Sequence, residues 1–368
     1  MKTKRIFVCC TEQSGENICY NILKRLDLSN TIVDGVCGDL SKKFLTNKYY
    51  DISDFKSIGL IEILFSIRKY ISMINYLKNK ILNNNYDLII CIDSPDFNYN
   101  LVKSLRKNKY NKKIIQIVAP TVWAWRSKRA KKFAKIYNEI FLLFDFEKKY
   151  FNYPNFHSTF IGHPIYHIKK RKINNRYKYI SFLFGSRENE ITKLFKYFND
   201  LENYIYTNNL EWEIFIPTLP HLTEIIKNKT KFWKTKTTIS NDISNFDKYF
   251  DEVFVSVTCS GTATLEIAKR NIPQIIIYKL NYFTELILKF FVKVKRACIL
   301  NIVSTEIIIP EIVNSKLTRN SIINSFKKLL DDKQFRDNQI ININKHLCKI
   351  ESDISPYELS AKRINSLI

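Results

Sequence analysis

A short apolar run between two aspartates constrains the fold of this chain more than any other feature. Residues 88–92 read Leu-Ile-Ile-Cys-Ile, between Asp87 and Asp93, and Pro95 follows. The run is too short for a helix, and an isoleucine-rich run without polar alternation is typical of a buried parallel strand. Because Pro95 does not fit a central strand, we expect the strand to end at Asp93. The run therefore predicts an α/β fold.

The position of Asp93 makes its carboxylate a candidate general base. Ligands of open α/β sheets gather at the carboxyl ends of the strands, and the rigid turn at Pro95 would hold the side chain there. The alternative is that Asp93 only caps a helix beginning near Phe97. The spacing alone favours neither interpretation.

Strands and helices alternate through both halves of the chain. Apolar runs predict strands at 4–10, 32–37, 88–92, 113–118 and 139–144, and then at 178–184, 211–217, 252–257 and 273–278. The polar, charged stretch 167–177 is typical of a linker, so we expect a domain boundary near residue 170. The C-terminal residues 320–368 are expected to form helices with charged faces.

The composition excludes several classes of protein. A hydrophobic content of 45% excludes a disordered chain, and 368 residues suffice for about two domains. The eight cysteines include no C-x-x-C, which predicts a reduced, cytoplasmic protein. Pro164 separates His163 from His167, so we expect no metal site. The first apolar run is too short for a signal peptide, and none approaches the length of a transmembrane helix.

The formal net charge of +24 admits two interpretations. It is compatible with an anionic partner, either a phosphosugar or a membrane surface. A basic nucleic-acid-binding protein would instead gather basic residues and exposed aromatics on one face. The lysines are spread along the whole chain, so we expect no nucleic acid partner.

Two apolar segments with basic residues are candidates for contact with lipid. Segment 58–82 has helical periodicity but is apolar nearly all round, which favours burial. The alternative is that one side meets lipid, with Arg68, Lys69 and Lys78 near the head groups. Segment 282–296 is apolar with a basic end and is the second candidate.

Loops at the strand ends carry most of the candidate binding residues. The loop after the first strand holds one glycine, Gly15, and no G-x-G-x-x-G, so a dinucleotide site is not expected. The loop beyond strand 113–118 holds Trp123, Trp125 and Arg126. Packing is the usual role of a tryptophan, but two of them in such a loop favour the wall of a ligand site.

Two helix starts in the second half are marked by glycine. Gly185-Ser186-Arg187 and Ser260-Gly261-Thr262 each lie between a strand and a helix, where free backbone N–H groups suit an anion. Arg187 can grip a phosphate, whereas capping by Ser186 is the alternative. Ser260 and Thr262 are expected to cap the second helix, and Glu266 lies at a spacing that suits ribose hydroxyls. Together these features indicate a diphosphate-linked nucleotide.

The order of these motifs resembles that of the lipid-A-disaccharide synthase family, the glycosyltransferases of lipid A assembly. The matching stretches span residues 12 to about 314 and are Glu12-Gln-Ser-Gly15, 58–64, IDSPDFN at 92–98, VAPTVWAWR at 118–126, 146–148, FIGHP at 160–164, GSR at 185–187, SGTATLE at 260–266 and Leu300-Asn301. The resemblance implies a GT-B fold of two facing Rossmann-like domains with parallel sheets, in which C-terminal helices cross back to the first domain. Residues 1–170, completed by about 345–368, would form the acceptor-side domain, and 171–344 the UDP-sugar-binding domain.

The resemblance also implies the reaction. UDP-2,3-diacylglucosamine would donate its sugar to 2,3-diacylglucosamine 1-phosphate with inversion, releasing UDP, with Asp93 as the base and no metal or cofactor. Arg187 and the helix start at Gly261 would offset charge on the departing UDP. The implied substrate-binding residues are Glu12, Ser14, Gly15, Asn98, Trp123, Trp125, Arg126, Gly185, Ser186, Ser260, Gly261, Thr262, Glu266 and Asn301, with Glu266 and Asn301 at the ribose and uracil. The enzyme would sit peripherally on the cytoplasmic face of the inner membrane, and a homodimer is compatible with the resemblance.

The chain departs from the family pattern at four positions. Thr11 stands for the first glycine of the first loop, Glu16 for its aspartate, Phe184 for the proline before Gly185, and Ile299 interrupts the usual Leu-Pro-Asn. None of these departures removes a proposed chemical group. A different GT-B enzyme acting on UDP-sugars, such as a UDP-N-acetylglucosamine epimerase, would share the glycine-marked helix starts but not both the 92–98 and 118–126 motifs.

Overall fold

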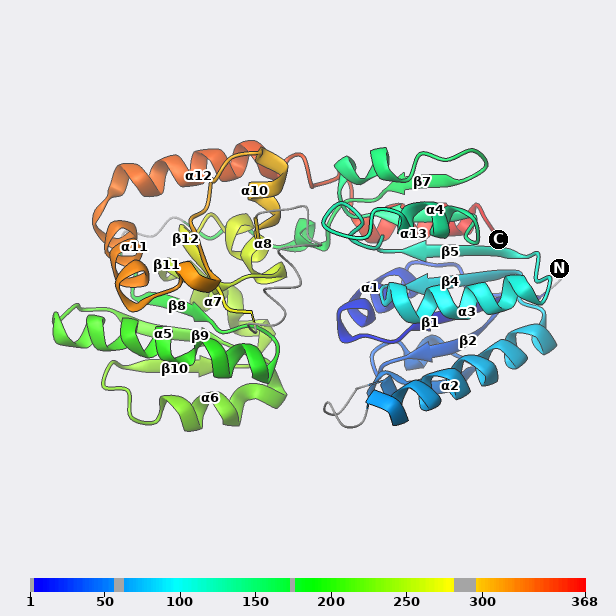
Figure 1. Cartoon of the computed structure of the whole chain (residues 1–368), viewed down its shortest axis with the longest axis horizontal. Coiled ribbons are helices and arrows are strands. Elements are labelled where there is room, and N and C mark those ends of the chain that lie inside the picture. Colours follow the sequence, from blue (N-terminus) through cyan, green and yellow to red (C-terminus); the bar gives the residue numbers. More distant parts are fainter. Residues whose placement is uncertain (1–2, 56–62, 173–175, 281–295) are drawn as a thin grey trace. The chain divides into compact units, whose positions relative to one another are not determined.

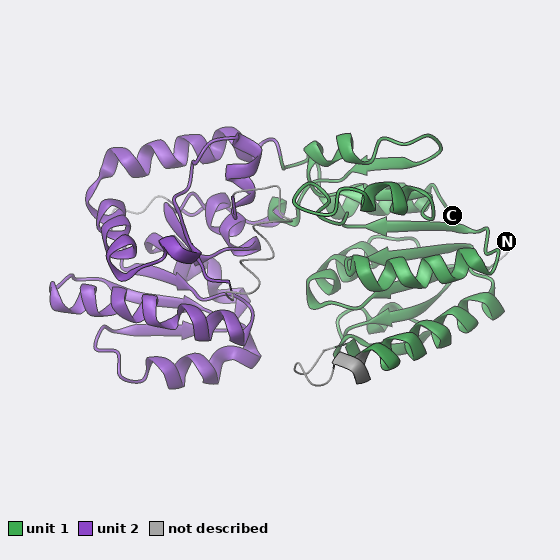
Figure 2. Ribbon diagram, in the orientation of Figure 1, with its two compact units in different colours: residues 1–166, 350–368 green, residues 167–349 purple. Residues whose placement is uncertain are grey.

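The computed structural model describes residues 3–55, 63–172, 176–280 and 296–368 (Figure 1). The chain divides into two compact units (Figure 2). Unit 1 consists of residues 1–166 and 350–368, and unit 2 of residues 167–349. In each unit the described strands form one parallel sheet flanked by helices, which confirms the expected α/β fold.

Unit 1 contains a seven-stranded sheet in the order β3-β2-β1-β4-β5-β6-β7. The strands are β1 (Lys4–Cys10), β2 (Thr31–Cys37), β3 (Asn47–Asp51), β4 (Leu88–Ile92), β5 (Lys113–Ile117), β6 (Glu139–Leu142) and β7 (His157–Phe160). One face packs against α2 (Ile63–Asn84), α3 (Pro95–Lys107) and α4 (Arg129–Ala134), and the other against α1 (Gln13–Leu23) and α13 (Pro356–Asn365). Because successive strand residues point to opposite faces, Phe7 lies in the first core and Ile6 in the second.

Unit 2 contains a six-stranded sheet in the order β10-β9-β8-β11-β12-β13. The strands are β8 (Tyr179–Leu183), β9 (Glu213–Pro217), β10 (Thr237–Ser240), β11 (Val253–Cys259), β12 (Gln274–Tyr278) and β13 (Glu311–Val313). Its described helices are α5 (Glu188–Thr207), α6 (Thr223–Thr230), α7 (Phe246–Asp251), α8 (Thr262–Lys269), α10 (Ile299–Ser304), α11 (Arg319–Asp331) and α12 (Lys333–Leu347). Helices α5, α6 and α11 supply one core, and α7 and α8 supply the other.

The expected strands are confirmed with small shifts at their ends, but four strands were not predicted. These four, β3, β7, β10 and β13, are the outer strands of the two sheets. Most of their side chains are partly exposed, as in β3 (Asn47–Asp51), where no residue is fully buried. An outer strand does not need a continuous apolar run, so the pattern that revealed the central strands is absent from it.

The last helix of the chain returns to unit 1. Helix α13 places Tyr357, Ala361 and Ile364 in the core beside α1. Arg363 forms a two-pronged ion pair with Glu139, with Nε 2.9 Å from Oε1 and Nη2 2.9 Å from Oε2. Residues 320–349 remain in unit 2, so only the end of the expected helical region crosses back.

The motif at 160–164 lies where the returning chain meets unit 1. The N–H of His163 donates to the carbonyl of Ile350 at 3.2 Å. Gly162 has φ +84, and a Cβ there would lie 2.2 Å from the Oγ of Ser352. Only glycine therefore fits at this position. The motif holds the returning C-terminal segment against the rest of unit 1.

The structure describes most of one candidate segment for lipid contact, 58–82, and almost none of the other, 282–296. Residues 58–62 lie outside the described residues, as does segment 282–296 except for Arg296. The described part of the first segment is in α2, which buries Met73 and Leu77 but leaves Ile67 50% and Ile71 54% exposed. The expectation that this helix is buried on all sides is therefore wrong. Among the described helices, none has the length and hydropathy that crossing a bilayer requires.

Candidate active site

The candidate residues of unit 1 gather at the point where the strand order reverses. Strand β1 pairs with β2 on one side and with β4 on the other. The loops that follow β1 and β4 therefore leave the sheet in divergent directions, and ligands of open α/β sheets bind at such a point. Ser14 and Gly15 follow β1, and Asp93 follows β4.

Asp93 is held by hydrogen bonds to its main chain. Its N–H donates to Ile117 at 3.0 Å, and its carbonyl accepts from Asn98 Nδ2 at 2.8 Å and from Gln116 Nε2 at 2.9 Å. Both Asp93 (φ +53) and Ser94 (φ +43) adopt the left-handed region, which is uncommon outside glycine. Such backbone persists only where the surroundings hold it, and here the sheet and α3 do so.

The carboxylate of Asp93 faces the loop after β1. Oδ2 accepts a hydrogen bond from the Ser14 hydroxyl at 2.5 Å, although 79 residues separate the two in sequence. Helix α3 begins at Pro95 with Ser94 as its N-cap, so Asp93 does not cap it. Gly15 permits this approach, because a Cβ there would lie 3.1 Å from the Cβ of Asp93. Glu12 is the N-cap residue of α1.

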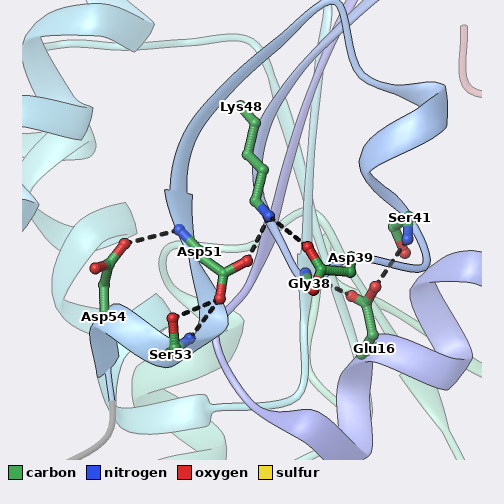
Figure 3. Close-up of polar contacts among 8 residues, drawn as sticks. All are labelled: Glu16, Gly38, Asp39, Ser41, Lys48, Asp51, Ser53 and Asp54. Carbon is green, nitrogen blue, oxygen red and sulfur yellow. Dashed lines mark hydrogen bonds and ion pairs between the residues drawn. The ribbon is translucent and has the colours of Figure 1, made fainter.

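Two departures from the family pattern add hydrogen bonds around this loop. The Thr11 hydroxyl donates to the Oγ of Ser94 at 2.7 Å, which links the two loops a second time. Glu16 is only 1% exposed, and its carboxylate accepts the N–H groups of Gly38 at 2.9 Å and Ser41 at 2.8 Å (Figure 3). Figure 3 also shows Lys48 between Asp39 and Asp51 in the same region. The two hydrogen bonds accepted by Glu16 tie the first turn of α1 to the loop after β2.

The tryptophan loop divides into a buried and an accessible part. Trp123 is 8% exposed, and its Nε1 donates to Glu147 Oε1 at 3.1 Å. Burial raises the pKa of Glu147 to about 7. The expectation that Trp123 forms a ligand wall is therefore not met, because its ring packs inside unit 1. Trp125 is half-buried, and the guanidinium of exposed Arg126 lies 4.1 Å from its ring centre, so this pair remains a candidate contact.

The candidate residues of unit 2 lie at the equivalent point of the second sheet. Strands β8 and β11 are neighbours, and the helices that follow them, α5 and α8, pack in the cores on opposite faces of the sheet. Gly185 follows β8 with φ +103, and a Cβ there would lie 2.4 Å from Glu190 Oε2 and 3.1 Å from Cys259 Sγ. The two loops named from the sequence therefore approach each other at the strand ends.

Glu190 organises the turn that carries Arg187. Its Oε2 accepts the N–H of Ser186 at 3.0 Å, and its Oε1 lies 3.3 Å from Nη1 of Arg187. The Arg187 side chain is 76% exposed and the Glu190 side chain only 15%. Arg187, and not Ser186, is the N-cap residue of α5, so the capping interpretation of Ser186 is wrong. Sequence reasoning missed Glu190, although its place in the first turn after the motif was a usable signal.

The second helix start is open and polar. Gly261 is the N-cap of α8 with φ +151, and a Cβ there would meet no atom within 4 Å. The Ser260 hydroxyl donates to Ala297 at 3.2 Å, so the expectation that Ser260 and Thr262 cap the helix is wrong. Glu266 lies further along α8, half-buried, and burial raises its pKa. This helix start leaves its first N–H groups available to an anion.

Asn301 does not offer its side chain to a ligand. It is fully buried, and its Nδ2 donates to Ile309 at 2.7 Å and to Glu311 at 2.6 Å. Its Oδ1 accepts the N–H groups of Ile308 at 2.8 Å and Ile309 at 3.0 Å. These bonds use the amide fully, so Asn301 holds the chain between α10 and β13 together.

Comparison with known proteins identifies the family. Residues 6–363 match the family model described as lipid-A-disaccharide synthetase. The chain belongs to this family. A lipid-A-disaccharide synthase from Rickettsia typhi is 32% identical over 98% of both chains. Members of the family form the lipid A disaccharide, so the chain is a glycosyltransferase of lipid A biosynthesis.

Solved structures agree on the fold. The glycotransferase of kitacinnamycin has a TM-score of 0.62 at 12% identity and covers 100% of both chains. UDP-GlcNAc 2-epimerase from Neisseria meningitidis bound to UDP-GlcNAc has a TM-score of 0.60 at 12% identity, covering 99% of this chain and 98% of its own. Identities this low show the fold alone, which is a GT-B fold of two Rossmann-like domains. The fold expected from the sequence is confirmed.

Proposed function

We propose that the chain transfers the sugar of UDP-2,3-diacylglucosamine to 2,3-diacylglucosamine 1-phosphate with inversion at the anomeric carbon. Asp93 takes the proton from the acceptor hydroxyl as its oxygen bonds to the anomeric carbon. The bond between that carbon and the diphosphate oxygen breaks, and its electron pair leaves with UDP. The products are the disaccharide 1-phosphate and UDP.

The position of the Asp93 carboxylate carries this proposal. It is half-exposed at the end of β4, it is hydrogen-bonded by Ser14, and its main chain is held by Asn98 and Gln116. A general base must be fixed within reach of the proton that it accepts, and a carboxylate on a rigid strand end meets this need.

We assign UDP binding to unit 2. Arg187 and the free N–H groups at the start of α8 supply positive charge toward a diphosphate, which stabilises the departing UDP. Because these groups can offset the charge, the proposed reaction needs no metal ion. Glu266 is assigned to the ribose hydroxyls. Asn301 is assigned an indirect role, since its amide is used by the main chain.

The acyl chains of the proposed substrates also bear on location. We propose that the enzyme works peripherally on the cytoplasmic face of the inner membrane, where such lipids are accessible. Exposed Ile67 and Ile71 on α2, beside Arg68 and Lys69, are compatible with contact to a lipid surface.

A disaccharide-forming assay tests the proposal. Purified protein in detergent is mixed with both lipids, with and without EDTA, and UDP release is followed. We expect release that needs both lipids and is unaffected by EDTA. Release without acceptor would indicate a hydrolase, and inhibition by EDTA would contradict the metal-independent reaction.

Two variants assign the roles. Asp93→Asn should lower turnover by about 10²–10⁴-fold and leave UDP affinity near wild type, because it removes only the base. Arg187→Ala should weaken UDP binding and turnover together. Weak UDP binding by Asp93→Asn would indicate a structural residue, and normal UDP binding by Arg187→Ala would refute the diphosphate assignment.

A further inference from the structure

A lysine-lined pocket lies on unit 1, outside the candidate active site. It has a volume of about 750 Å³ and is lined by Ser127, Lys128, Lys131, Lys132, Lys135, Lys149, Tyr150 and Tyr153. Ser127 and the lysines before residue 136 lie in α4 or beside its ends, whereas Lys149, Tyr150 and Tyr153 follow β6. We call this feature the lysine pocket.

The amphipathic character of α4 places these lysines together. Ala130 is 2% exposed and Phe133 is fully buried in the core, where the Phe133 ring stacks on Tyr137. The burial of this face turns the lysines at 128, 131, 132 and 135 outward, and all four are exposed. Their positions are thus fixed by the packing of the helix.

The charges in the lysine pocket are not balanced within the described part of unit 1. The acidic residues nearest in sequence have other partners: Glu139 pairs with Arg363 at 2.9 Å, and Asp145 pairs with Lys148 at 2.6 Å. Glu147 is buried and accepts a hydrogen bond from Trp123 at 3.1 Å. Among the described residues, no carboxylate forms an ion pair with any of the pocket's five lysines. Five like charges around one hollow repel one another, and an anionic partner would relieve this repulsion.

We propose that the lysine pocket is the surface through which this protein binds anionic phospholipid head groups. This rests on the proposed peripheral location and adds a head-group-binding surface to the apolar contact proposed for α2. Lysines attract anionic head groups, and tyrosines favour the membrane–water interface. Tyr150 and Tyr153 are only half-buried at the rim of the core, and the Lys149 ammonium lies 5.2 Å from the Tyr150 ring.

The tyrosines favour a lipid surface over single-stranded nucleic acid. Stacking with bases needs an exposed ring face. Both tyrosines instead pack against the core cluster of unit 1, leaving only part of each ring at the surface. The experiment must distinguish binding to a lipid surface from binding to an oligonucleotide.

Sedimentation with vesicles tests this proposal. The full chain is mixed with phosphatidylcholine vesicles that contain or lack phosphatidylglycerol, at low and raised salt. We expect binding only to the anionic vesicles, weakening as salt shortens the range of the attraction. Lys131→Gln/Lys132→Gln should lower the partition coefficient about thirtyfold, because each lysine near an anionic surface contributes roughly fivefold.

A matched variant controls for net charge. Lys103 and Lys107 are exposed on α3 of the same unit, so Lys103→Gln/Lys107→Gln changes the charge equally outside the pocket. It should bind vesicles like wild type. Equal loss by both variants or equal binding to neutral vesicles would overturn the proposal. Binding of a single-stranded oligonucleotide that persists at the salt concentration where vesicle binding is lost would also overturn it, because stacking and not charge would then hold the partner.

The detergent assay separates this proposal from the proposed function. Lys131→Gln/Lys132→Gln should turn over detergent-dispersed substrates at the wild-type rate, since the pocket is not part of the chemistry. Loss of vesicle binding with normal turnover supports the lysine pocket. Loss of turnover in detergent would overturn its assignment as a membrane surface alone.

Discussion

Replacing Gly15 with alanine tests whether the position of Asp93 sets the rate of transfer. The new Cβ would lie 2.9 Å from Cys10 Sγ and 3.1 Å from Asp93 Cβ. Unstrained carbon contacts need about 3.5–4.0 Å, so the loop after β1 or Asp93 must move by roughly half an ångström. Because a misplacement of about 1 Å can lower a rate about a hundredfold, we expect turnover to fall between about tenfold and a hundredfold.

Three measurements define the result. Turnover with both lipids in detergent gives kcat, equilibrium binding gives the affinity for UDP, and urea unfolding gives stability. Overpacking should cost about 1–3 kcal/mol of the free energy of unfolding, which leaves the protein folded. The UDP affinity should remain at the wild-type value, because the proposed UDP-binding residues belong to unit 2.

Removing the Cys10 sulfur separates the two contacts. In Gly15→Ala/Cys10→Ala, the contact with sulfur is gone but the contact with Asp93 remains. We expect part of the stability to return while turnover stays low. Turnover of Gly15→Ala within about twofold of wild type, or full recovery in the double variant, would refute the reasoning.

Three further predictions concern carboxylates. Glu190→Gln keeps an acceptor for the N–H of Ser186 but removes the negative charge 3.3 Å from Arg187. Calorimetry should therefore show UDP binding about two- to fivefold tighter. Weaker binding would mean that Glu190 positions the turn. Burial raises the pKa of Glu147 from 4.5 to about 7, so the native protein binds more protons than the unfolded chain in this interval. The contribution of Glu147 to the free energy of unfolding should decline by about 3 kcal/mol as pH rises from 4.5 to 7. Urea unfolding of wild type and Glu147→Gln across this range measures the decline, and the same pH dependence in both proteins would contradict the prediction. Arg363→Ala leaves the 2%-exposed Glu139 without its cation and should lower the free energy of unfolding by about 2–3 kcal/mol. Adding Glu139→Gln should restore part of that stability, and no recovery in the double variant would contradict a charge effect.

The sequence predicted the interior of each sheet better than its borders. Strand β4 is buried along its whole length, and its apolar run was sufficient to find it. Strand β3, by contrast, has only partly buried or exposed residues and contains Asn47, Lys48 and Asp51. Its pairing with β2 depends on the main chain, whose hydrogen bonds leave no periodicity in the sequence.

The candidate site shows a similar division. The end of a buried strand at Asp93 and the glycines at 185 and 261 follow from local pattern, because strand burial and left-handed backbone restrict the residue types. Trp123 and Asn301 could not be assigned in this way. Whether a buried indole or amide is satisfied within the fold depends on Glu147 in one case and on the Ile308–Ile309 main chain in the other.

The sequence by itself determined the alternation of strands and helices, the family, and the residue types at the ends of the strands, since each is a local consequence of burial, turn geometry or motif. Only the tertiary structure decided which strand ends are neighbours. The order of strands joins Ser14 to Asp93 in unit 1 and the Gly185 turn to Cys259 in unit 2. Parallel pairing brings these distant residues together because it depends on main-chain hydrogen bonds and crossover connections, which the side-chain pattern of a single strand does not encode.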